Sequence, residues 1–159
     1  MNIRVGFGFD VHQLAEGETL IIGGVNIPHN KGTVAHSDGD VLIHAICDAL
    51  LGAANLRDIG YQFPDNSNEF KNIDSKILLN RTIQLIENKG YRVGNIDSTI
   101  ALQNPKMKPY IEEMQQILAD IMKVSTDDIS IKATTTEKLG FEGREEGVSA
   151  YATVLIFKH

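Results

Sequence analysis

The sequence predicts an α/β (α+β) fold: a single two-layer domain, residues 1–159, with helices packed on one face of a mixed β-sheet. Extended segments rich in β-branched residues alternate along the chain with segments whose apolar residues recur at helical spacing. A length of 159 residues with 42% hydrophobic residues suits one compact core. We find neither an internal repeat nor an interdomain linker.

The N-terminal third is expected to form a layer of strands. Residues 3–11 have the composition of a strand, and residues 20–27 hold two short apolar runs around Gly23 and Gly24, a pattern typical of a β-hairpin. The later extended segments are residues 91–103, 129–136 and 148–157.

Three segments are predicted to be amphipathic helices because apolar residues recur three and four positions apart. These segments are residues 40–54, 75–89 and 110–123. Asp74 is a typical N-cap for the second helix, and Gly90 ends it. Ser37, with Asp40 three residues later, resembles a capping box. This predicts the polar cluster at residues 36–39 at the start of the first helix, where backbone N–H groups can receive an anion.

Composition argues against several classes of partner and location. The formal net charge is −6 and no Lys/Arg-dense block is present, so we expect no nucleic acid and no membrane among the partners. Cys47 is the only cysteine, which rules out an intrachain disulfide and suggests a buried thiol in a reducing cytoplasm. Neither a targeting segment nor an apolar run long enough to span a bilayer is visible.

A candidate metal site comes from three side chains. Asp10 and His12 are two apart in a predicted strand, so both leave the same face and can reach one ion. His44 is expected on a helix face shared with Asp40 and Asp48. A surface carboxylate beside an ordinary histidine, and a core histidine bonded to a helical carboxylate, stay open as alternatives. Together the three form an N,N,O set that suits Zn²⁺ with a fourth position open to a substrate oxygen.

Four other segments carry polar groups that could act on a substrate. The threonines at 134–136 can donate to phosphate oxygens and Glu137 can hold a hard cation such as Mg²⁺, although β propensity equally explains a threonine run. Residues 58–60 and 63–65 are either turns or acceptors for substrate hydroxyls. The proline-bracketed loop at 103–109 is either a solvated turn or a backbone cradle for a flat base.

Taken in chain order, these motifs resemble one family over nearly the entire sequence, the 2-C-methyl-D-erythritol 2,4-cyclodiphosphate synthases. The motifs are Gly8-Phe9-Asp10-Val11-His12, Ala35-His36-Ser37-Asp38-Gly39-Asp40 with His44, Asp58-Ile59-Gly60, Phe63-Pro64-Asp65, Pro105-Lys106-Met107 and Thr134-Thr135-Thr136-Glu137-Lys138-Leu139-Gly140-Phe141. Several independent motifs in the same order make coincidence a poor explanation.

The resemblance implies a role for each motif. Asp10, His12 and His44 would hold one Zn²⁺ per chain, and Glu137 a second divalent cation, Mg²⁺ or Mn²⁺, at the substrate diphosphate. The catalytic residues that help stabilise the transition state would be His36 and Thr135. The residues expected to contact substrate are Asp10, His12, His36, Ser37, Asp58, Ile59, Gly60, Phe63, Pro64, Asp65, Asn66, Ser67, Leu102, Gln103, Asn104, Pro105, Lys106, Met107, Lys108, Thr134, Thr135, Thr136, Glu137, Phe141 and Arg144.

Within that set, the resemblance assigns His36 and Ser37 to phosphate and the segments 58–60 and 63–67 to the methylerythritol end. Residues 102–108 would enclose cytosine and ribose, and residues 134–137 the diphosphate. The implied substrate is a small cytidine diphosphate, 4-diphosphocytidyl-2-C-methyl-D-erythritol 2-phosphate. Its 2-phosphate attacks the β-phosphorus and releases CMP, a lyase reaction of the non-mevalonate route to isoprenoid precursors.

The resemblance further implies a homotrimer with active sites between neighbouring subunits. Two residues depart from the family pattern: Glu145 stands where many members have glycine, and Tyr151 where Gln or Glu is frequent near the trimer axis. These departures bear on ligand binding in the axial channel and not on catalysis.

Two rival functions use the same three ligands. A zinc phosphohydrolase would activate water there and use Glu137 for a second ion. A non-catalytic zinc-binding or assembly protein would use the ligands only to join a strand to a helix, with a fourth protein ligand closing the site.

Overall fold

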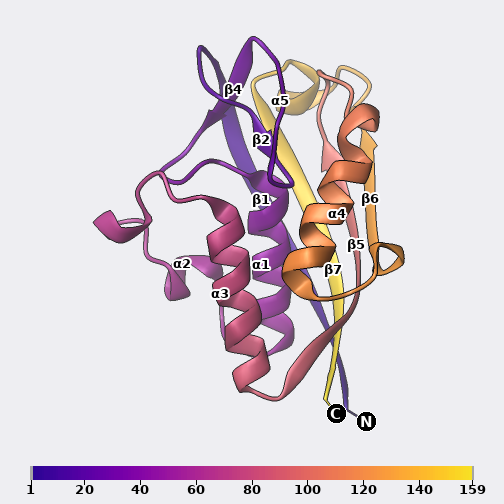
Figure 1. Cartoon of the computed structure of the whole chain (residues 1–159). Helices are drawn as coiled ribbons and strands as arrows, with labels where there is room; N and C mark the ends of the chain where they lie inside the picture. The colour runs from indigo at the N-terminus through magenta and orange to yellow at the C-terminus, as the bar shows by residue number, and fades with distance from the viewer. Residues whose placement is uncertain (1, 159) are drawn as a thin grey trace.

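A five-stranded sheet forms the centre of the computed structural model, which describes residues 2–158 (Figure 1). In spatial order the strands are β4 (Lys31–Val34), β1 (Ile3–Glu16), β7 (Gly147–Lys158), β5 (Tyr91–Ala101) and β6 (Ile129–Thr134). Neighbouring strands are antiparallel except for the parallel pair β5 and β6, so the predicted mixed sheet is confirmed. The two ends of the chain lie side by side, and the Lys158 N–H donates to the Asn2 carbonyl at 2.8 Å.

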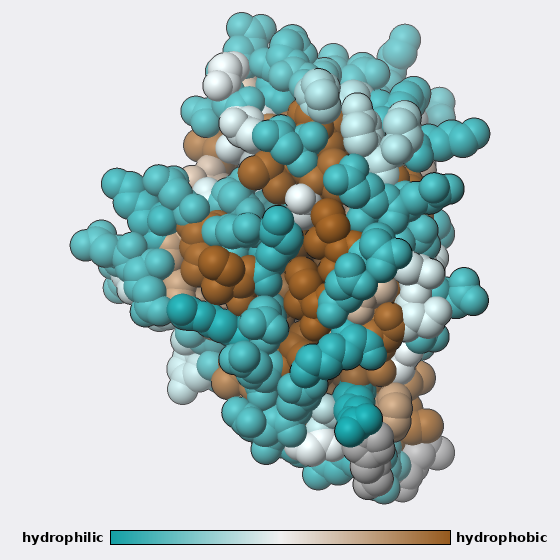
Figure 2. Space-filling model, viewed as in Figure 1, coloured by the Kyte–Doolittle hydropathy of each residue, from teal (hydrophilic) through white to brown (hydrophobic). Residues whose placement is uncertain are grey.

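Three helices cover one face of this sheet, which confirms the predicted two layers (Figure 1). They are α1 (Val41–Ala53), α3 (Ser75–Asn88) and α4 (Ile111–Met122). On this side hydrophilic residues form most of the surface, and hydrophobic residues gather in the middle, where α1 lies between α3 and α4 (Figure 2). No helix among residues 2–158 is long and apolar enough to cross a membrane.

The remaining elements are short. The predicted hairpin is present around Gly23 and Gly24, and Cys47 is buried as expected. Several of the loops contain a single helical turn. The short elements are β2 (Ile21–Ile22), β3 (Val25–Asn26), α2 (Ile59–Gln62), α5 (Gly140–Gly143) and the 3₁₀ turns η1 (Asn68–Phe70), η2 (Lys108–Tyr110) and η3 (Thr126–Asp128).

Strand β1 is longer than predicted because it has a partner that the sequence pattern did not reveal. Its last four residues, Gln13 to Glu16, pair with β4. Strand β4 is only four residues long and contains Gly32, so it is too short for a two-residue period to mark it as a strand. Extension of β1 keeps Asp10 and His12 in the middle of a paired strand rather than at its frayed end.

Two glycines on β1 allow α1 to lie directly on the sheet. A Cβ atom added to Gly6 would lie 1.9 Å from the carbonyl oxygen of Ala49, and one added to Gly8 would lie 1.9 Å from that of Ala45. Any other residue at these positions would therefore push the helix away. This close approach brings His44, which precedes Ala45 on α1, within reach of the strand.

The N-terminus of α1 differs from its prediction. Asp40, not Ser37, is the N-cap: its carboxylate accepts the Ile43 N–H at 3.0 Å and the N–H groups of Gly23 and Gly24 at 2.9 and 2.7 Å. The predicted capping box is therefore wrong. A fully buried carboxylate that ties the hairpin to the helix start satisfies three donors at once, which a serine hydroxyl cannot do.

Neither Asp40 nor Asp48 forms a side-chain hydrogen bond with His44, although the three were predicted on a similar helix face. Asp40 points to the hairpin, and Asp48 accepts the N–H of Ile59 at 2.7 Å. Each carboxylate accepts hydrogen bonds from backbone N–H groups of a different segment. His44 thus has no helical carboxylate as its partner, contrary to the core-histidine alternative.

We predict that Asp40→Ala destabilises the protein by about 3 kcal/mol, because it removes an N-cap and leaves buried N–H groups without acceptors. Urea unfolding followed by circular dichroism measures this loss. Asp74→Ala is the matched control: Asp74 caps α3 through the Lys76 N–H but is exposed, so it should cost about 1 kcal/mol. Equal losses in the two variants would contradict the role given to Asp40.

The opposite face of the sheet carries an exposed row of apolar side chains. On β1 every second residue from Ile3 to Val11 points away from the helices, and Val5 and Phe7 are 66% and 64% exposed. The Phe9 ring lies against the Tyr151 ring of β7, with centroids 5.2 Å apart. An apolar row of this length on a sheet face is typical of a protein–protein interface.

Candidate functional site

Asp10, His12 and His44 converge where β1 meets α1. The Asp10 Oδ2 atom lies 2.9 Å from His12 Nε2 and 3.1 Å from His44 Nδ1, and the two nitrogens are 3.1 Å apart. Among residues 2–158 this is the only cluster of three or more His, Cys, Asp or Glu side chains with that arrangement. The alternation of β1 places the first two on the helix-covered face, and the close packing of α1 supplies the third.

The electrostatics of this cluster favour a cation. Burial alone would raise the pKa of Asp10, but hydrogen bonds and charge from His12 and His44 outweigh it and lower that pKa to about 2. Burial would lower the pKa of His44, yet the Asp10 carboxylate raises it. A carboxylate and two imidazoles that face one another at hydrogen-bond distance form a donor set for one divalent metal.

No fourth His, Cys, Asp or Glu of residues 2–158 joins the cluster. The site is therefore not closed in the way that the non-catalytic alternative requires.

A cavity of about 160 Å³ opens beside the three side chains. It brings together predicted residues from four segments of the sequence. These lining residues are Asp10, His12, His36, Ser37, His44, Ile59, Gly60, Phe63 and Asp65. Phe70, Ile73 and Leu78 also line it and were not predicted, because apolar residues in a loop and a helix carry no signal for a site.

Four predicted residues in this region do not line the cavity. Asp58 caps α2 through the Tyr61 N–H, and the backbone carbonyl of Ser67 lies 3.3 Å from His36 Nε2. Pro64 and Asn66 are exposed beside them. Ser67 thus orients the imidazole of His36 instead of lining the cavity itself.

A second cavity of about 280 Å³ lies at the ends of β5 and β6. It is lined by two predicted segments, 102–108 and 134–135, that are distant in sequence from the metal cluster of Asp10, His12 and His44. The segments meet because β5 and β6 are parallel and the Leu102 N–H donates to the Thr134 carbonyl at 3.0 Å. Its predicted lining residues are Leu102, Pro105, Lys106, Met107, Lys108, Thr134 and Thr135.

Three predicted residues of these segments do not line the second cavity and instead form hydrogen bonds within the surrounding loops. Gln103 Oε1 accepts the Lys138 N–H at 3.4 Å, and Asn104 Nδ2 donates to Glu145 Oε1 at 3.0 Å. Thr136 is half-buried, and its hydroxyl donates to the Leu139 carbonyl at 2.6 Å.

Glu137, Phe141 and Arg144 lie outside both cavities. Glu137 is exposed, with a backbone φ of 55°, and does not belong to the metal cluster. Phe141 lines a hollow that also borders His12, and Arg144 forms an ion pair with Glu146 at 2.8 Å. Within one chain these three side chains do not reach the metal cluster's cavity.

The two cavities share no lining residue. His36 lines the first and Thr135 the second, so one chain does not bring its two predicted catalytic residues into a common cavity.

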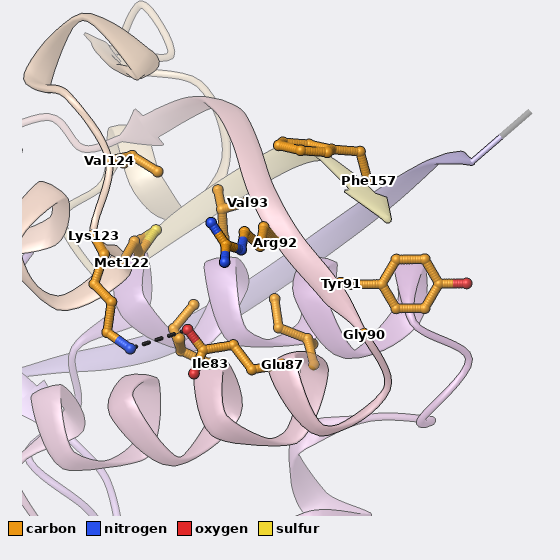
Figure 3. Close-up of a pocket in the computed structure, with 11 residues that line it drawn as sticks. Ile83, Glu87, Gly90, Tyr91, Arg92, Val93, Met122, Lys123, Val124 and Phe157 are labelled. Atoms are coloured by element: carbon orange, nitrogen blue, oxygen red, sulfur yellow. Dashed lines mark hydrogen bonds and ion pairs between the residues drawn. The ribbon is translucent and has the colours of Figure 1, made fainter. Parts of the chain in front are cut away.

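A hollow larger than either cavity lies elsewhere. It measures about 540 Å³ and is bordered by the end of α3, the start of β5 and the end of α4, with the Lys123–Glu87 ion pair at 3.0 Å along its edge (Figure 3). Ile83, Val93 and Met122 form its apolar wall. It contains none of the predicted site residues, so the chemistry of the side chains and not the size of the hollow locates the site.

Comparison with known proteins identifies the relatives of this chain. Residues 3–157 match the model of the YgbB family. A 2-C-methyl-D-erythritol 2,4-cyclodiphosphate synthase from Bacteroides fragilis is 69% identical over 156 residues, 98% of each chain. One of the same name from Bacteroides thetaiotaomicron is 66% identical over 158 residues, 99% of each chain.

Solved structures agree. The bifunctional IspDF from Campylobacter jejuni matches with a TM-score of 0.95 and 43% identity over 99% of this chain, which corresponds to 42% of that longer chain. The IspF of Plasmodium falciparum in a CDP complex matches with a TM-score of 0.87 and 34% identity, over 99% of this chain and 98% of that one. The chain therefore belongs to the YgbB family, the family of the 2-C-methyl-D-erythritol 2,4-cyclodiphosphate synthases.

Proposed function

We propose that this chain is a 2-C-methyl-D-erythritol 2,4-cyclodiphosphate synthase that acts in the cytoplasm. Relatives of that name are 62–69% identical over nearly the whole chain. The observation that carries the proposal is the cavity in which the metal cluster meets His36, Ser37 and the segment around Asp65. It combines a cation site with groups suited to a phosphate and a polyol.

The reaction is an intramolecular phosphoryl transfer. An oxygen of the 2-phosphate attacks the β-phosphorus, the bond from that phosphorus to the bridging oxygen breaks, and CMP leaves with that oxygen. Asp10, His12 and His44 would hold Zn²⁺, which would supply Lewis-acid charge neutralisation at the diphosphate. No protein nucleophile is needed, because the enzyme's task is alignment and charge stabilisation.

The side chains around the cluster align the substrate. His36, oriented by the Ser67 carbonyl, lies at the same cavity as Ser37, and the Ser37 hydroxyl donates to a phosphate oxygen. Asp65 and the backbone at Gly60 face the cavity, where they hold the methylerythritol hydroxyls. These contacts place an oxygen of the 2-phosphate next to the β-phosphorus, so the bound substrate is already close to the geometry of the attack.

The second cavity is proposed to bind the cytidine. Its walls combine the apolar side chains of Met107 and Ile131 with loop backbone, which suits a flat base, and Lys106 and Thr135 add donors for phosphate. A related synthase structure is described as a bound form with CDP and has 35% identity to this chain.

Assembly completes the site in this proposal. The metal cavity and the nucleotide cavity share no residue, although one substrate must span both. The exposed apolar row on β1 offers a surface that a neighbouring subunit can cover. A homotrimer with each site between two subunits accounts for both observations.

A second divalent cation, Mg²⁺ or Mn²⁺, is proposed at Glu137 with the substrate diphosphate. Its exposed carboxylate follows the threonines of the nucleotide cavity. We predict that Glu137→Gln lowers turnover about tenfold or more while zinc content stays at one per chain, with partial recovery at high Mg²⁺ or Mn²⁺.

Metal analysis and steady-state kinetics measure this effect. Glu113→Gln, which neutralises an exposed carboxylate on α4, is the control and should behave as the native protein. Joint loss of zinc and activity in Glu137→Gln would contradict separate metal roles.

One assay tests the proposed function against its rival. The purified protein is incubated with 4-diphosphocytidyl-2-C-methyl-D-erythritol 2-phosphate, zinc and Mg²⁺, and products are separated by chromatography and ³¹P NMR. CMP together with a cyclic diphosphate supports the synthase. Inorganic phosphate or an open-chain product would show that the three ligands activate water, as in a phosphohydrolase.

A further inference from the structure

The nitrogen of His44 that faces away from the metal cluster lies in a buried hydrogen-bond chain. Its Nε2 atom is 2.9 Å from the Oγ of Ser75, which is the first residue of α3 and is fully buried. The Ser75 hydroxyl donates in turn to Oδ1 of Asp38. This chain links His44 on α1 to the start of α3 and to the loop before α1.

Two backbone N–H groups donate hydrogen bonds to the Asp38 carboxylate and fix its position. Its Oδ1 accepts the Asp40 N–H at 3.1 Å, and its Oδ2 accepts the Ser75 N–H at 2.8 Å. Both oxygens face donors, so this carboxylate accepts the hydroxyl proton of Ser75 as well.

Counting protons along the chain determines the tautomer of His44. Ser75 Oγ has one proton, and that proton goes to Asp38. Toward His44 the same oxygen can only accept, so Nε2 must carry a hydrogen. In the neutral ring, Nδ1 then presents its lone pair toward Asp10 and His12, which is the form that ligates a metal.

We propose that Ser75, held by Asp38, is a positioning residue that sets the tautomer and ring plane of His44 for metal binding. This rests on the proposed zinc site. Ser37 Oγ also lies near His44 Nε2, at 3.2 Å, but its proton has no acceptor other than that nitrogen among residues 2–158. In the absence of substrate Ser37 can therefore serve either tautomer, and only Ser75 distinguishes them.

The experiment measures zinc affinity by competition with a chromophoric chelator in the full-length protein. Ser75→Ala should weaken zinc binding about 10–100-fold, the usual effect of losing a partner behind a metal ligand. Ser75→Thr keeps the hydroxyl and should restore affinity to within a few-fold. Thr82→Val is the matched control: it removes another buried hydroxyl of α3, which donates to the Leu78 carbonyl and does not touch His44.

Replacement of zinc by Co²⁺ gives a second measurement that a merely structural role would not alter. The visible bands of the Co²⁺ protein should shift in Ser75→Ala and keep their native position in Thr82→Val, because only the first change alters the orientation of His44. If Ser75→Ala does not fold, Ser75→Cys replaces it, since a thiol of similar size is a weak acceptor and should give the same loss.

The outcomes separate the two proposals. Native protein that binds one zinc, with Ser75→Ala and Ser75→Cys equal to it in affinity and spectrum, overturns the role of Ser75 and leaves the zinc site standing. An equal loss of affinity in Thr82→Val also overturns that role, because the effect would then be general destabilisation. Native protein that binds no zinc overturns the zinc site and the role of Ser75 together.

Discussion

His12→Ala and His44→Ala are each expected to abolish stoichiometric zinc binding and to reduce CMP release by roughly a thousandfold. Each change removes one of three side chains whose ligating atoms lie 2.9–3.1 Å apart. Two remaining ligands do not hold Zn²⁺ firmly, and the lost charge neutralisation at the diphosphate corresponds to roughly 4 kcal/mol of transition-state stabilisation. Metal analysis after dialysis and a CMP assay measure the two effects.

The control is His29→Ala, a histidine in the loop after β3 that lines neither the metal cavity nor the nucleotide cavity. It should keep native zinc content and turnover. Full zinc and full activity in both His12→Ala and His44→Ala would show that the ligand assignment is wrong.

Mixing two inactive variants is expected to restore activity if sites lie between subunits. His12→Ala disables the metal face, and Lys106→Glu disables the nucleotide cavity by placing a negative charge where phosphate binds. After co-refolding in equal amounts, an intact site needs a Lys106→Glu metal face beside a His12→Ala nucleotide face. Random mixing in a closed ring provides this at roughly one site in four, so activity should return to about a quarter of native.

Each variant refolded alone is the control for this experiment and should stay inactive. Analytical ultracentrifugation and differently tagged chains establish that mixed assemblies form. Mixed trimers that contain both variants and remain inactive would mean that each site is built within one chain.

Local pattern predicted the elements that carry the metal ligands. The two-residue period of a strand placed Asp10 and His12 on one face, and helical spacing placed His44 on α1. Both follow from backbone geometry over a few residues, so the sequence alone is sufficient. The same spacing did not reveal that Asp40 and Asp48 accept backbone N–H groups of other segments, because periodicity gives the direction of a side chain but not its partner.

Partners that are distant in sequence could not be predicted. Nothing in the chain marks Ser75 as the acceptor for His44, 31 positions away, or Gly23 as a donor to Asp40. Such contacts depend on the distance and angle at which α1, α3 and the hairpin pack, and these are set by the whole core.

By itself the sequence determined the fold class, the position of the helices and the segments that make the site. Short-range sterics, hydrophobic period and motif order are properties of the chain. Only the tertiary structure decided that the metal cluster and the nucleotide segment form two cavities, and that one sheet face stays apolar and exposed. The cavities are separate because β7 lies between β1 and the pair β5 and β6. The apolar face is exposed because no element of residues 2–158 covers it, whereas Gly6 and Gly8 let α1 cover the opposite face of β1 closely.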